Sequence, residues 1–320
     1  MIRNYQETDF PALAALWNTA GVAQGYAPQT PEALAGLLTE NPYFSPAYAF
    51  VLEEAGAVTG FTCGCAGDEL PQGKARGYFT CLLLEEGHET AENAAALLSA
   101  LEDAFRRAGK TQLAANFFNP MRLPWTVPGT PGHQHNNCPG VAEDLPLHRW
   151  ALAAGWTVRA VECAMYLDLD RFEMPDWVEE KAQTLAADGY AVDWYQSGRH
   201  RGLSEMVRSM GNPMWDAEIP QAAEKINMLV ALWGDQVAGF TGPVYPEPTG
   251  RGYFAGIAVA KAHEGHGLGT LLFYRLCQAE KEAGSRYMSL FTGSDNHAQK
   301  IYLQAGFQVR RRFSVMTKEL

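Results

Sequence analysis

The chain has 320 residues, of which 47% are hydrophobic, and its formal net charge at pH 7 is -11. This composition gives enough core for two ordinary domains, and no apolar run is long enough to span a membrane. The acidic balance argues against a nucleic-acid partner and favours cationic over anionic ligands. The six cysteines lie mainly in apolar segments without the spacing of a disulfide scaffold. Reduced core thiols and a cytoplasmic location are therefore expected.

The first residues predict a strand and a helix rather than a signal peptide. Met1 to Tyr5 begins a strand, and Thr8-Asp9-Phe10-Pro11 provides a cap and a first-turn proline for the helix that follows. The apolar face of this helix is predicted to consist of Leu13, Leu16 and Trp17.

Residues 119–146 are dense in proline and glycine, a composition that predicts a long loop without regular elements. Within it, His133, His135 and Cys138 form an HxHxxC pattern, but a zinc site would need a fourth nearby ligand. The aromatic and imidazole side chains of the loop suit an interface or a wall of an acceptor site, and this is the favoured role.

A domain boundary is predicted near residue 172. The strand pattern of Cys163 to Leu169 changes at Asp170 to Asp176 into a charged, proline-containing segment. The predicted domains are therefore residues 1–172 and 173–320. In order, the second half predicts a strand at Tyr190 to Tyr195, a helix around Gly202 to Met210 and a hairpin over Leu229 to Phe240.

A glycine-rich run, His263 to Leu272, lies between a strand pattern and a helix pattern. The strand is Tyr253 to Val259, and the helix has its apolar side chains at helical spacing. Glycines allow the backbone N–H groups to turn toward a ligand, and the helix N-terminus adds partial positive charge. The run therefore predicts a phosphate cradle, which suits a pyrophosphate. Its glycines are Gly265, Gly267 and Gly269.

Another strand, Tyr287 to Thr292, is followed by a helix that Asn296 is predicted to cap and that ends at Gly306. Taken together, these features resemble the GNAT (GCN5-related N-acetyltransferase) superfamily. The matching residues span about 253 to 320 and are Ile257-x-Val259, the glycine loop, Asn296, Tyr302 and Gly306-Phe307. The resemblance implies acetyl-CoA as co-substrate and direct acetyl transfer to an amine, without a metal.

The resemblance also assigns roles to residues of this chain. In the family, backbone N–H groups of the loop hold the pyrophosphate of acetyl-CoA, and a strand N–H, here that of Val259, contacts the thioester carbonyl. Tyr302 is matched to the general acid that protonates the CoA thiolate, and Asn296 to a contact with the pantetheine arm. The implied acetyl-CoA contacts are Ile257, Val259, Glu264, Gly265, His266, Gly267, Leu268, Gly269, Thr270, Asn296 and Tyr302.

One position departs from the family pattern, because the family usually has Arg or Gln where this chain has Glu264. A carboxylate beside a pyrophosphate is unfavourable, and the net negative charge adds to the effect. The loop binds mainly through backbone donors, so weaker CoA affinity is expected rather than lost binding.

Short sequence matches recur in order between the two halves of the chain. Arg76-Gly77-Tyr78-Phe79 recurs as Arg251-Gly252-Tyr253-Phe254, and Ala108-Gly109 recurs as Ala283-Gly284, both at an offset of 175 residues. Further on, Ala154-Gly155 matches Ala305-Gly306 at an offset of 151. These matches predict an α+β protein of two tandem GNAT-like domains, each a mixed, mostly antiparallel central sheet flanked by helices.

The first copy is predicted to be catalytically degenerate. Thr90, Glu92 and Ala94 stand where the second copy has its glycines, and Ala151 and Leu145 stand opposite Tyr302 and Asn296. The change of offset locates an insertion of 24 residues within 119–146. A degenerate first copy and an intact second copy resemble the architecture of mycothiol synthase, but no acceptor motif of that enzyme can be matched here.

The predicted function is an acyl-CoA-dependent N-acyltransferase that acetylates a primary amine of a small molecule or peptide. Asp216, Glu218 and Glu247 are expected in loops near the cleft, but none is assigned as the general base. A non-catalytic acetyl-CoA sensor remains an alternative, although Tyr302 argues against it. A dinucleotide-binding oxidoreductase fits poorly, because the loop is GxGxG rather than GxGxxG. Arg310-Arg311-Arg312 is interpreted as a solvated strand start.

Overall fold

The computed structural model describes residues 1–117 and 119–320, which form two compact units. Unit 1 comprises Met1–Ala164 and Val309–Leu320, and unit 2 comprises Met165–Gln308. The repeat boundary near 172 stays a prediction. The compact units differ from the predicted ranges at the C-terminus, because Val309–Leu320 packs within unit 1 and completes its sheet.

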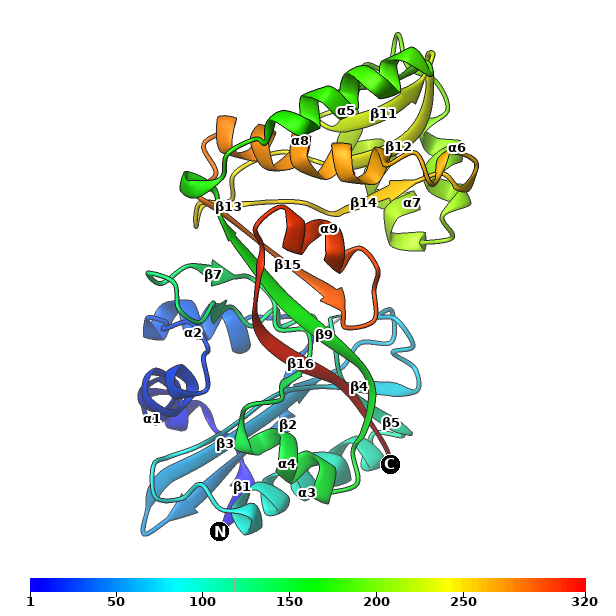
Figure 1. The fold of residues 1–320 in the computed structure, drawn as a ribbon. Coiled ribbons are helices and arrows are strands. Elements are labelled where there is room, and N and C mark those ends of the chain that lie inside the picture. Colours follow the sequence, from blue (N-terminus) through cyan, green and yellow to red (C-terminus); the bar gives the residue numbers. More distant parts are fainter. Residues whose placement is uncertain (118) are drawn as a thin grey trace. The chain divides into compact units, whose positions relative to one another are not determined.

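Unit 1 is built on a mixed sheet with the strand order β1-β2-β3-β4-β5-β16-β9, in which β4 and β5 are parallel. Its elements are β1 (Ile2–Asn4), α1 (Phe10–Leu16), α2 (Pro31–Leu38), β2 (Phe44–Glu54), β3 (Ala57–Cys65), β4 (Arg76–Leu84), α3 (Ala91–Arg107), β5 (Gln112–Ala115), β6 (Trp125–Thr126), β7 (Gln134–His135), β8 (Val141–Ala142), α4 (Pro146–Ala153), the first part of β9 (Thr157–Asp168) and β16 (Gln308–Glu319). Figure 1 shows these elements.

The central strands of unit 1 are buried on both faces. Along β4, Cys81 and Leu83 join the core under α1 and α2, whereas Leu82 and Leu84 join the core under α3 and α4. Since successive strand residues point to opposite faces, helices must cover both sides of the sheet. This arrangement explains why β3 and β4 are almost continuously apolar in sequence.

The predicted N-terminal elements are confirmed. β1 covers Ile2–Asn4, and α1 begins after Asp9 with a proline in its first turn. The predicted side-chain cap is not made, because the Asp9 carboxylate accepts from Arg3 and from the N–H of Gln6 instead. The predicted apolar face of Leu13, Leu16 and Trp17 is buried. Within the described part of the chain, no helix combines the length and apolar character needed to cross a membrane. All six cysteines are free thiols there, five of them buried.

The prediction that residues 119–146 lack regular elements is wrong. β6 and β7 form a short antiparallel pair, and β8 pairs with β16 through Val141 and Ser314. The backbone of the insertion is therefore partly satisfied by sheet hydrogen bonds. It also lines a pocket within unit 1 together with β4 and β5, to which it contributes Trp125, Cys138, Gly140 and Val141. Its role as an interface or acceptor-site wall stays a prediction.

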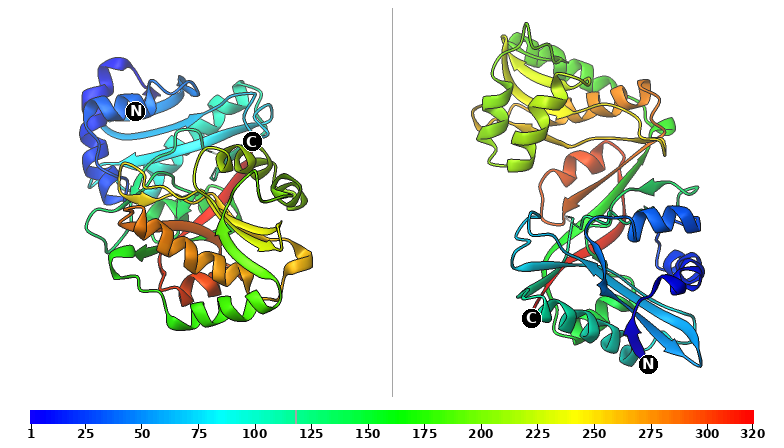
Figure 2. Two further views of the ribbon diagram at one scale, coloured as in Figure 1. Left: turned by 90° about the horizontal axis from the view of Figure 1, so that it is seen from above. Right: turned by 180° about the vertical axis from the view of Figure 1, so that it is seen from behind.

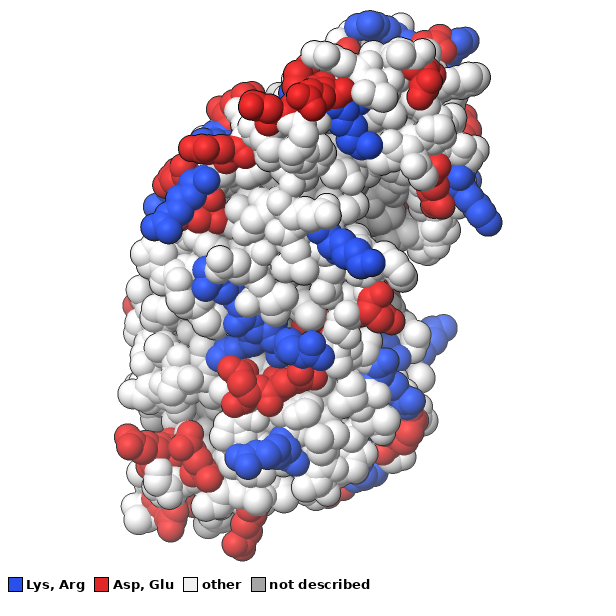
Figure 3. Space-filling view, in the orientation of Figure 1, with Lys and Arg blue, Asp and Glu red and all other residues white. Residues whose placement is uncertain are grey.

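The basic run begins β16 and is paired with acidic side chains of unit 1. Arg311 Nη2 lies 3.1 Å from Asp144 Oδ2, and Arg312 Nε lies 2.9 Å from Glu143 Oε2. On the face shown in Figure 3, basic and acidic side chains are interspersed. The run therefore lies near the start of a strand, as interpreted, but it is not solvated throughout, because only 12% of the Arg311 side chain is exposed. The absence of a nucleic-acid partner stays a prediction.

Unit 2 contains the antiparallel sheet β10-β11-β12-β14. In another sheet it has the strand order β9-β15-β13, in which β13 and β15 are parallel. Its elements are the end of β9, α5 (Asp176–Ala187), β10 (Tyr190–Trp194), α6 (Leu203–Ser209), α7 (Pro213–Ala223), β11 (Leu229–Trp233), β12 (Gln236–Gly242), β13 (Arg251–Gly252), β14 (Gly256–Val259), α8 (Leu268–Glu282), β15 (Tyr287–Gly293) and α9 (Gln299–Gln304). The predicted strand, helix and hairpin of this half are confirmed, whereas α5 and α7 were not predicted from the sequence.

Helices cover both faces of the four-stranded sheet in unit 2 (Figures 1 and 2). α8 packs on β11, β12 and β14 and lies beside α5, while α6 and α7 pack together on the opposite side. Phe240 of β12 contributes to the core under α6 and α7, and Leu272 of α8 approaches Gly239 from the other face.

The backbones of the two copies confirm the internal repeat. Arg76 pairs in parallel with Gln112, and Arg251 pairs in parallel with Tyr287, so both members are displaced by 175 residues. The glycines at the ends of the matching helices also share a left-handed conformation, with φ of +75° at Gly109 and +92° at Gly284. The shared residues therefore mark equivalent places in two related folds.

Glu280 is a fully buried carboxyl group on α8. It accepts hydrogen bonds from Ser285 Oγ at 2.6 Å and from the N–H of Tyr245 at 3.3 Å. Burial nevertheless dominates and raises the pKa of Glu280 to about 8, because desolvation penalises the charged form. Folded unit 2 therefore binds a proton at this position at neutral pH.

Replacing Glu280 with Gln is expected to flatten the pH dependence of stability. A folded pKa above the unfolded one means that the folded state binds more protons between about pH 4.5 and 8. The free energy of unfolding of the wild type should fall as pH rises through this range, by up to about 1.4 kcal/mol per pH unit. Chemical denaturation at several pH values measures this slope. The control is Glu282→Gln on the exposed face of α8, which should keep the wild-type slope.

Candidate active site

The glycine run forms a tight turn between β14 and α8. Gly265 and Gly267 both adopt left-handed backbone conformations, with φ of +83° and +82°, which L side chains rarely adopt. Gly267 is the N-cap of α8, and its carbonyl accepts from the N–H of Leu271 at 3.1 Å. The N–H groups in the first turn of α8 have no acceptor within the helix, so they are available to an anion.

Two N–H groups of β14 point away from β12. Ala260 N–H donates to the Ala238 carbonyl at 2.8 Å, which fixes the phase of the antiparallel ladder. Because hydrogen-bonded pairs alternate along such a ladder, Ile257 and Val259 occupy the non-bonded pairs, opposite Thr241 and Gly239. Their N–H groups therefore face the other edge of β14.

That other edge of β14 is open along the described residues. β15 pairs with β13 only at Arg251 and Gly252, and β14 belongs to a different sheet. The parallel strands therefore separate after Gly252 and leave a gap beside Val259. This geometry leaves a backbone donor free for a carbonyl oxygen, the contact that the resemblance implies for the N–H of Val259.

The start of α8 brings the end of β14 next to α9. A Cβ placed on Gly269 would lie 3.8 Å from Val259 Cγ2 and 3.9 Å from Ile301 Cδ1, which is ordinary van der Waals contact. Ile301 is adjacent in sequence to Tyr302. The structure therefore gathers the strand, the glycine turn and the tyrosine helix, as the sequence predicted.

Tyr302 is buried, with 5% of its surface exposed. Its ring centroid lies 4.6 Å from that of Phe273 and 6.2 Å from that of Phe307. Burial raises the pKa of Tyr302 to about 12, because the phenolate is less well solvated there. The side chain is therefore a protonated phenol at neutral pH, the form that a general acid requires.

Asn296 does not cap α9 directly. Its Oδ1 accepts from the N–H of Ala298 at 2.9 Å, and the helix begins only at Gln299. The side chain thus stabilises the turn that leads into the helix, which is a local structural role. The predicted helix is also shorter than expected and ends at Gln304, ahead of Gly306 with φ +95°. The contact between Asn296 and pantetheine stays a prediction.

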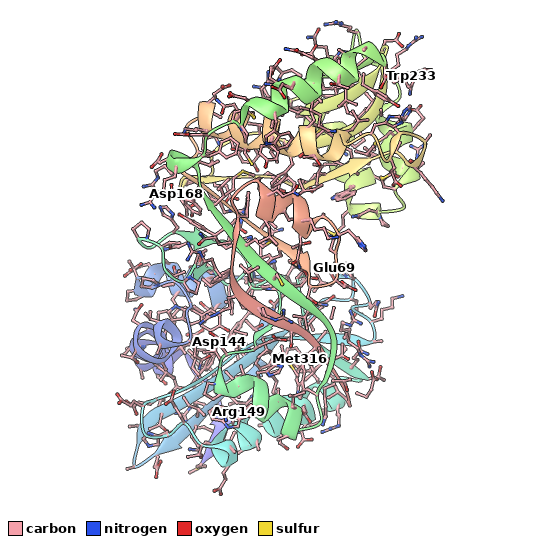
Figure 4. The ribbon with its side chains drawn as sticks, viewed as in Figure 1. Glu69, Asp144, Arg149, Asp168, Trp233 and Met316 are labelled. Carbon is pink, nitrogen blue, oxygen red and sulfur yellow. The ribbon has the colours of Figure 1, made fainter. Side chains whose placement is uncertain are left out.

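Aromatic and imidazole rings surround the glycine turn. Tyr190 Oη lies 3.0 Å from His263 Nδ1, and the ring centroids of Tyr190 and His266 are 5.0 Å apart. Trp233, labelled in Figure 4 at the end of β11, is 54% exposed and has its ring centroid 6.0 Å from that of His263. These side chains give the turn a partly apolar border.

Lys181 of α5 also reaches the turn, and sequence reasoning missed it. A Cβ on Gly267 would lie 2.5 Å from Lys181 Nζ. The sequence signal that points to it is the helical spacing of Val178, Lys181 and Leu185, which places a lysine on a face that is otherwise apolar and buried.

The predicted loop positions of two candidate bases are wrong, because Asp216 and Glu218 lie in α7. Asn212 caps this helix through its side chain, and a proline begins it. Glu218 accepts from Tyr253 Oη at 3.0 Å, while Glu247 Oε2 lies 2.7 Å from Arg251 Nε. The pKa of Tyr253 is raised by burial and by the Glu218 carboxylate, so the phenol keeps its proton at neutral pH.

In unit 1, the corresponding helix start carries no glycine turn. Thr90 is the N-cap of α3, and its Oγ1 accepts from the N–H of Asn93 at 3.2 Å. A side chain therefore occupies the place that an anion would take.

In the insertion, Cys138 Sγ donates to the Gly140 carbonyl, and no group of three His, Cys, Asp or Glu in the described residues could hold a metal ion.

Comparisons with known proteins agree with this geometry. Residues 186–307 match the model of the acetyltransferase (GNAT) family. A search of curated proteins finds no match. An acetyltransferase of this type from Sphaerobacter thermophilus aligns with a TM-score of 0.62 and 15% identity, covering 100% of this chain and 95% of its own. A tandem GNAT protein from the clavulanic acid biosynthesis pathway aligns with a TM-score of 0.58 and 19% identity. This alignment covers 100% of this chain and 98% of that protein.

A fungal multi-domain beta-N-acetylglucosaminidase has a GCN5-related glucosamine N-acetyltransferase region that aligns with a TM-score of 0.67 and 15% identity. The match covers 99% of this chain but only 38% of that protein. At these identities the structures show the fold alone, and the resemblance to mycothiol synthase stays a prediction. Residues 186–307 thus match the GNAT acetyltransferase family model, and over its whole length the chain has the fold of a tandem GNAT protein.

Proposed function

We propose that this protein is an N-acetyltransferase that transfers the acetyl group of acetyl-CoA to a primary amine of a small molecule or peptide. The observation that carries the proposal is the junction of three elements in unit 2. There, the left-handed glycine turn, β14 with its free N–H groups and α9, which carries the buried Tyr302, come together around the start of α8.

In the proposed reaction, N–H groups around His266 to Thr270 hold the pyrophosphate of acetyl-CoA. The N–H of Val259 donates to the thioester carbonyl oxygen as negative charge develops on it. The amine nitrogen bonds to the carbonyl carbon, the C–S bond breaks, and Tyr302 gives its proton to the departing sulfur. The proton lost by the amine passes to solvent, and the acetylated nitrogen leaves as an amide.

Calorimetric titration with acetyl-CoA, followed by a free-thiol release assay, tests the proposal. The amine panel should include polyamines, aminoglycosides, amino acids and short peptides. One site per chain is expected, because Thr90 caps the helix start in unit 1 and no glycine turn precedes it. Glu92→Ala in the first turn of that helix should leave the stoichiometry at one. Two sites per chain would show that the first copy is not degenerate.

A sensing module is the second candidate. It is favoured by the contacts of two candidate bases, because Glu218 is hydrogen-bonded to Tyr253 and Glu247 is paired with Arg251. A carboxylate with such a partner is less available to accept a proton from an amine. Stoichiometric binding without thiol release from any amine would support this function. Thiol release with one amine class would exclude it and identify the acceptor.

A further inference from the structure

Lys181 places an ammonium group against the glycine turn. A Cβ on Gly267 would lie 2.3 Å from Lys181 Cε and 2.5 Å from Lys181 Nζ. Because a C–C bond is about 1.5 Å long, the nitrogen is at most about 4 Å from Gly267 Cα. Lys181 precedes residues 186–307, so it lies outside the segment that matches the family model.

The helix that carries Lys181 is fixed on α8 by several contacts. Glu179 Oε2 lies 2.6 Å from Arg275 Nη2, and the rings of Trp177 and Tyr274 are 5.0 Å apart in an edge-to-face arrangement. On the side that Lys181 shares, Val178 and Leu185 are buried. The lysine is therefore directed inward by the packing of α5, not by a flexible loop.

This position is electrostatically unfavourable without a ligand. A helix N-terminus carries partial positive charge, so a cation beside it is repelled, by about 0.3–1 kcal/mol at exposed sites. Within the described part of the chain, Lys181 makes no ion pair with a carboxylate within 4.0 Å. An anion bound between the Lys181 ammonium and the N–H groups of α8 would be attracted by both positive charges and would offset their mutual repulsion.

We propose that Lys181 binds the pyrophosphate of acetyl-CoA and supplies the positive charge that the turn lacks at Glu264. The assignment rests on the proposed function of the turn. It makes α5 part of the co-substrate site. A flexible lysine acts here as a point charge, so its contribution should depend on charge and ionic strength rather than on exact geometry.

The test compares Lys181→Met with Lys225→Met, because both changes remove one ammonium group and keep an apolar stem. Lys225 is exposed near the end of α7 and serves as the matched control. We expect Lys181→Met to weaken acetyl-CoA binding about tenfold, the usual order for one charge-assisted contact. Lys225→Met should stay within twofold. The loss should shrink at high salt, and the melting temperature without ligand should not fall.

Two further ligands separate the outcomes. Acetyl-3′-dephospho-CoA keeps the pyrophosphate, so the same tenfold loss is expected, and a loss confined to acetyl-CoA would overturn the assignment. Inorganic pyrophosphate tests the anion site alone by thermal shift, and Lys181→Met should abolish its stabilising effect. If the wild type bound pyrophosphate but not acetyl-CoA, the proposed function would be refuted, whereas the anion site at Lys181 would be supported. Unchanged binding of all three ligands would refute the role of Lys181.

Discussion

Gly267→Val is expected to abolish acetyl-CoA binding, raising the dissociation constant at least 100-fold. With φ +82°, position 267 lies in the left-handed region, where a β-branched residue costs about 1–2 kcal/mol. The new Cβ would also overlap Lys181, whose Cε lies 2.3 Å from that position. The side chain would therefore displace the ammonium group and fill the space where backbone N–H groups meet an anion. Calorimetric titration measures the loss.

The matched control is Gly284→Val at the other end of α8. Gly284 has φ +92° and no atom within 4 Å of an added Cβ, so it carries the backbone penalty without blocking the turn. Both variants should lose similar stability in thermal denaturation, but Gly284→Val should bind acetyl-CoA within about twofold of the wild type. Equal binding losses in the two variants would mean that the effect comes from the helix and not from the turn.

The backbone elements of the candidate site could be predicted from the sequence because they are local. The turn, the strand before it and the helix after it lie within one short segment, and the left-handed glycines are recognisable from residue type. The repeat was also visible, since Arg76 and Arg251 mark the same parallel register in both copies. Such features depend on backbone conformation, which the residue type constrains directly.

The features that sequence reasoning missed depend on tertiary contacts. β16 completes the sheet of unit 1 beside β5, although it follows the second copy in the chain. The apolar pattern of a strand is the same in either sheet, so it does not specify which strand will be its neighbour. Lys181 was missed for a similar reason, because only the packing of α5 on α8 brings it to Gly267.

The predicted cap at Asn296 shows a third kind of limit. An asparagine before a helix pattern is compatible with an N-cap and with a turn that precedes the helix, since both use the same side-chain oxygen. Here Oδ1 accepts from the N–H of Ala298, so the second arrangement holds. Boundaries of short helices such as α9 follow from these local choices, which residue type alone does not decide.

Tyr302→Phe is expected to lower turnover about 100-fold or more, which is the loss typical of removing a positioned general acid. The affinity for acetyl-CoA should stay within about twofold of the wild type. The ring is held by Phe273 and Phe307, so its packing survives loss of the hydroxyl group. Tyr274→Phe is the matched control. Tyr274 is buried like Tyr302, but it lies on α8 and packs against Phe172 and Trp177, so loss of its hydroxyl group should not affect turnover. The measurements are thiol release under saturating substrates and calorimetric titration.

The pH profile adds an independent test of the same role. A general acid acts in its protonated form, and the pKa of Tyr302 is raised to about 12, so activity should not decline from its ionisation below about pH 11. An alkaline decline near pH 10 in the wild type that disappears in Tyr302→Phe would place the phenol in contact with water and contradict its burial. If Tyr302→Phe turned over as fast as the wild type, the reaction would not use the Tyr302 proton. The tyrosine would then serve only to pack α9 on α8.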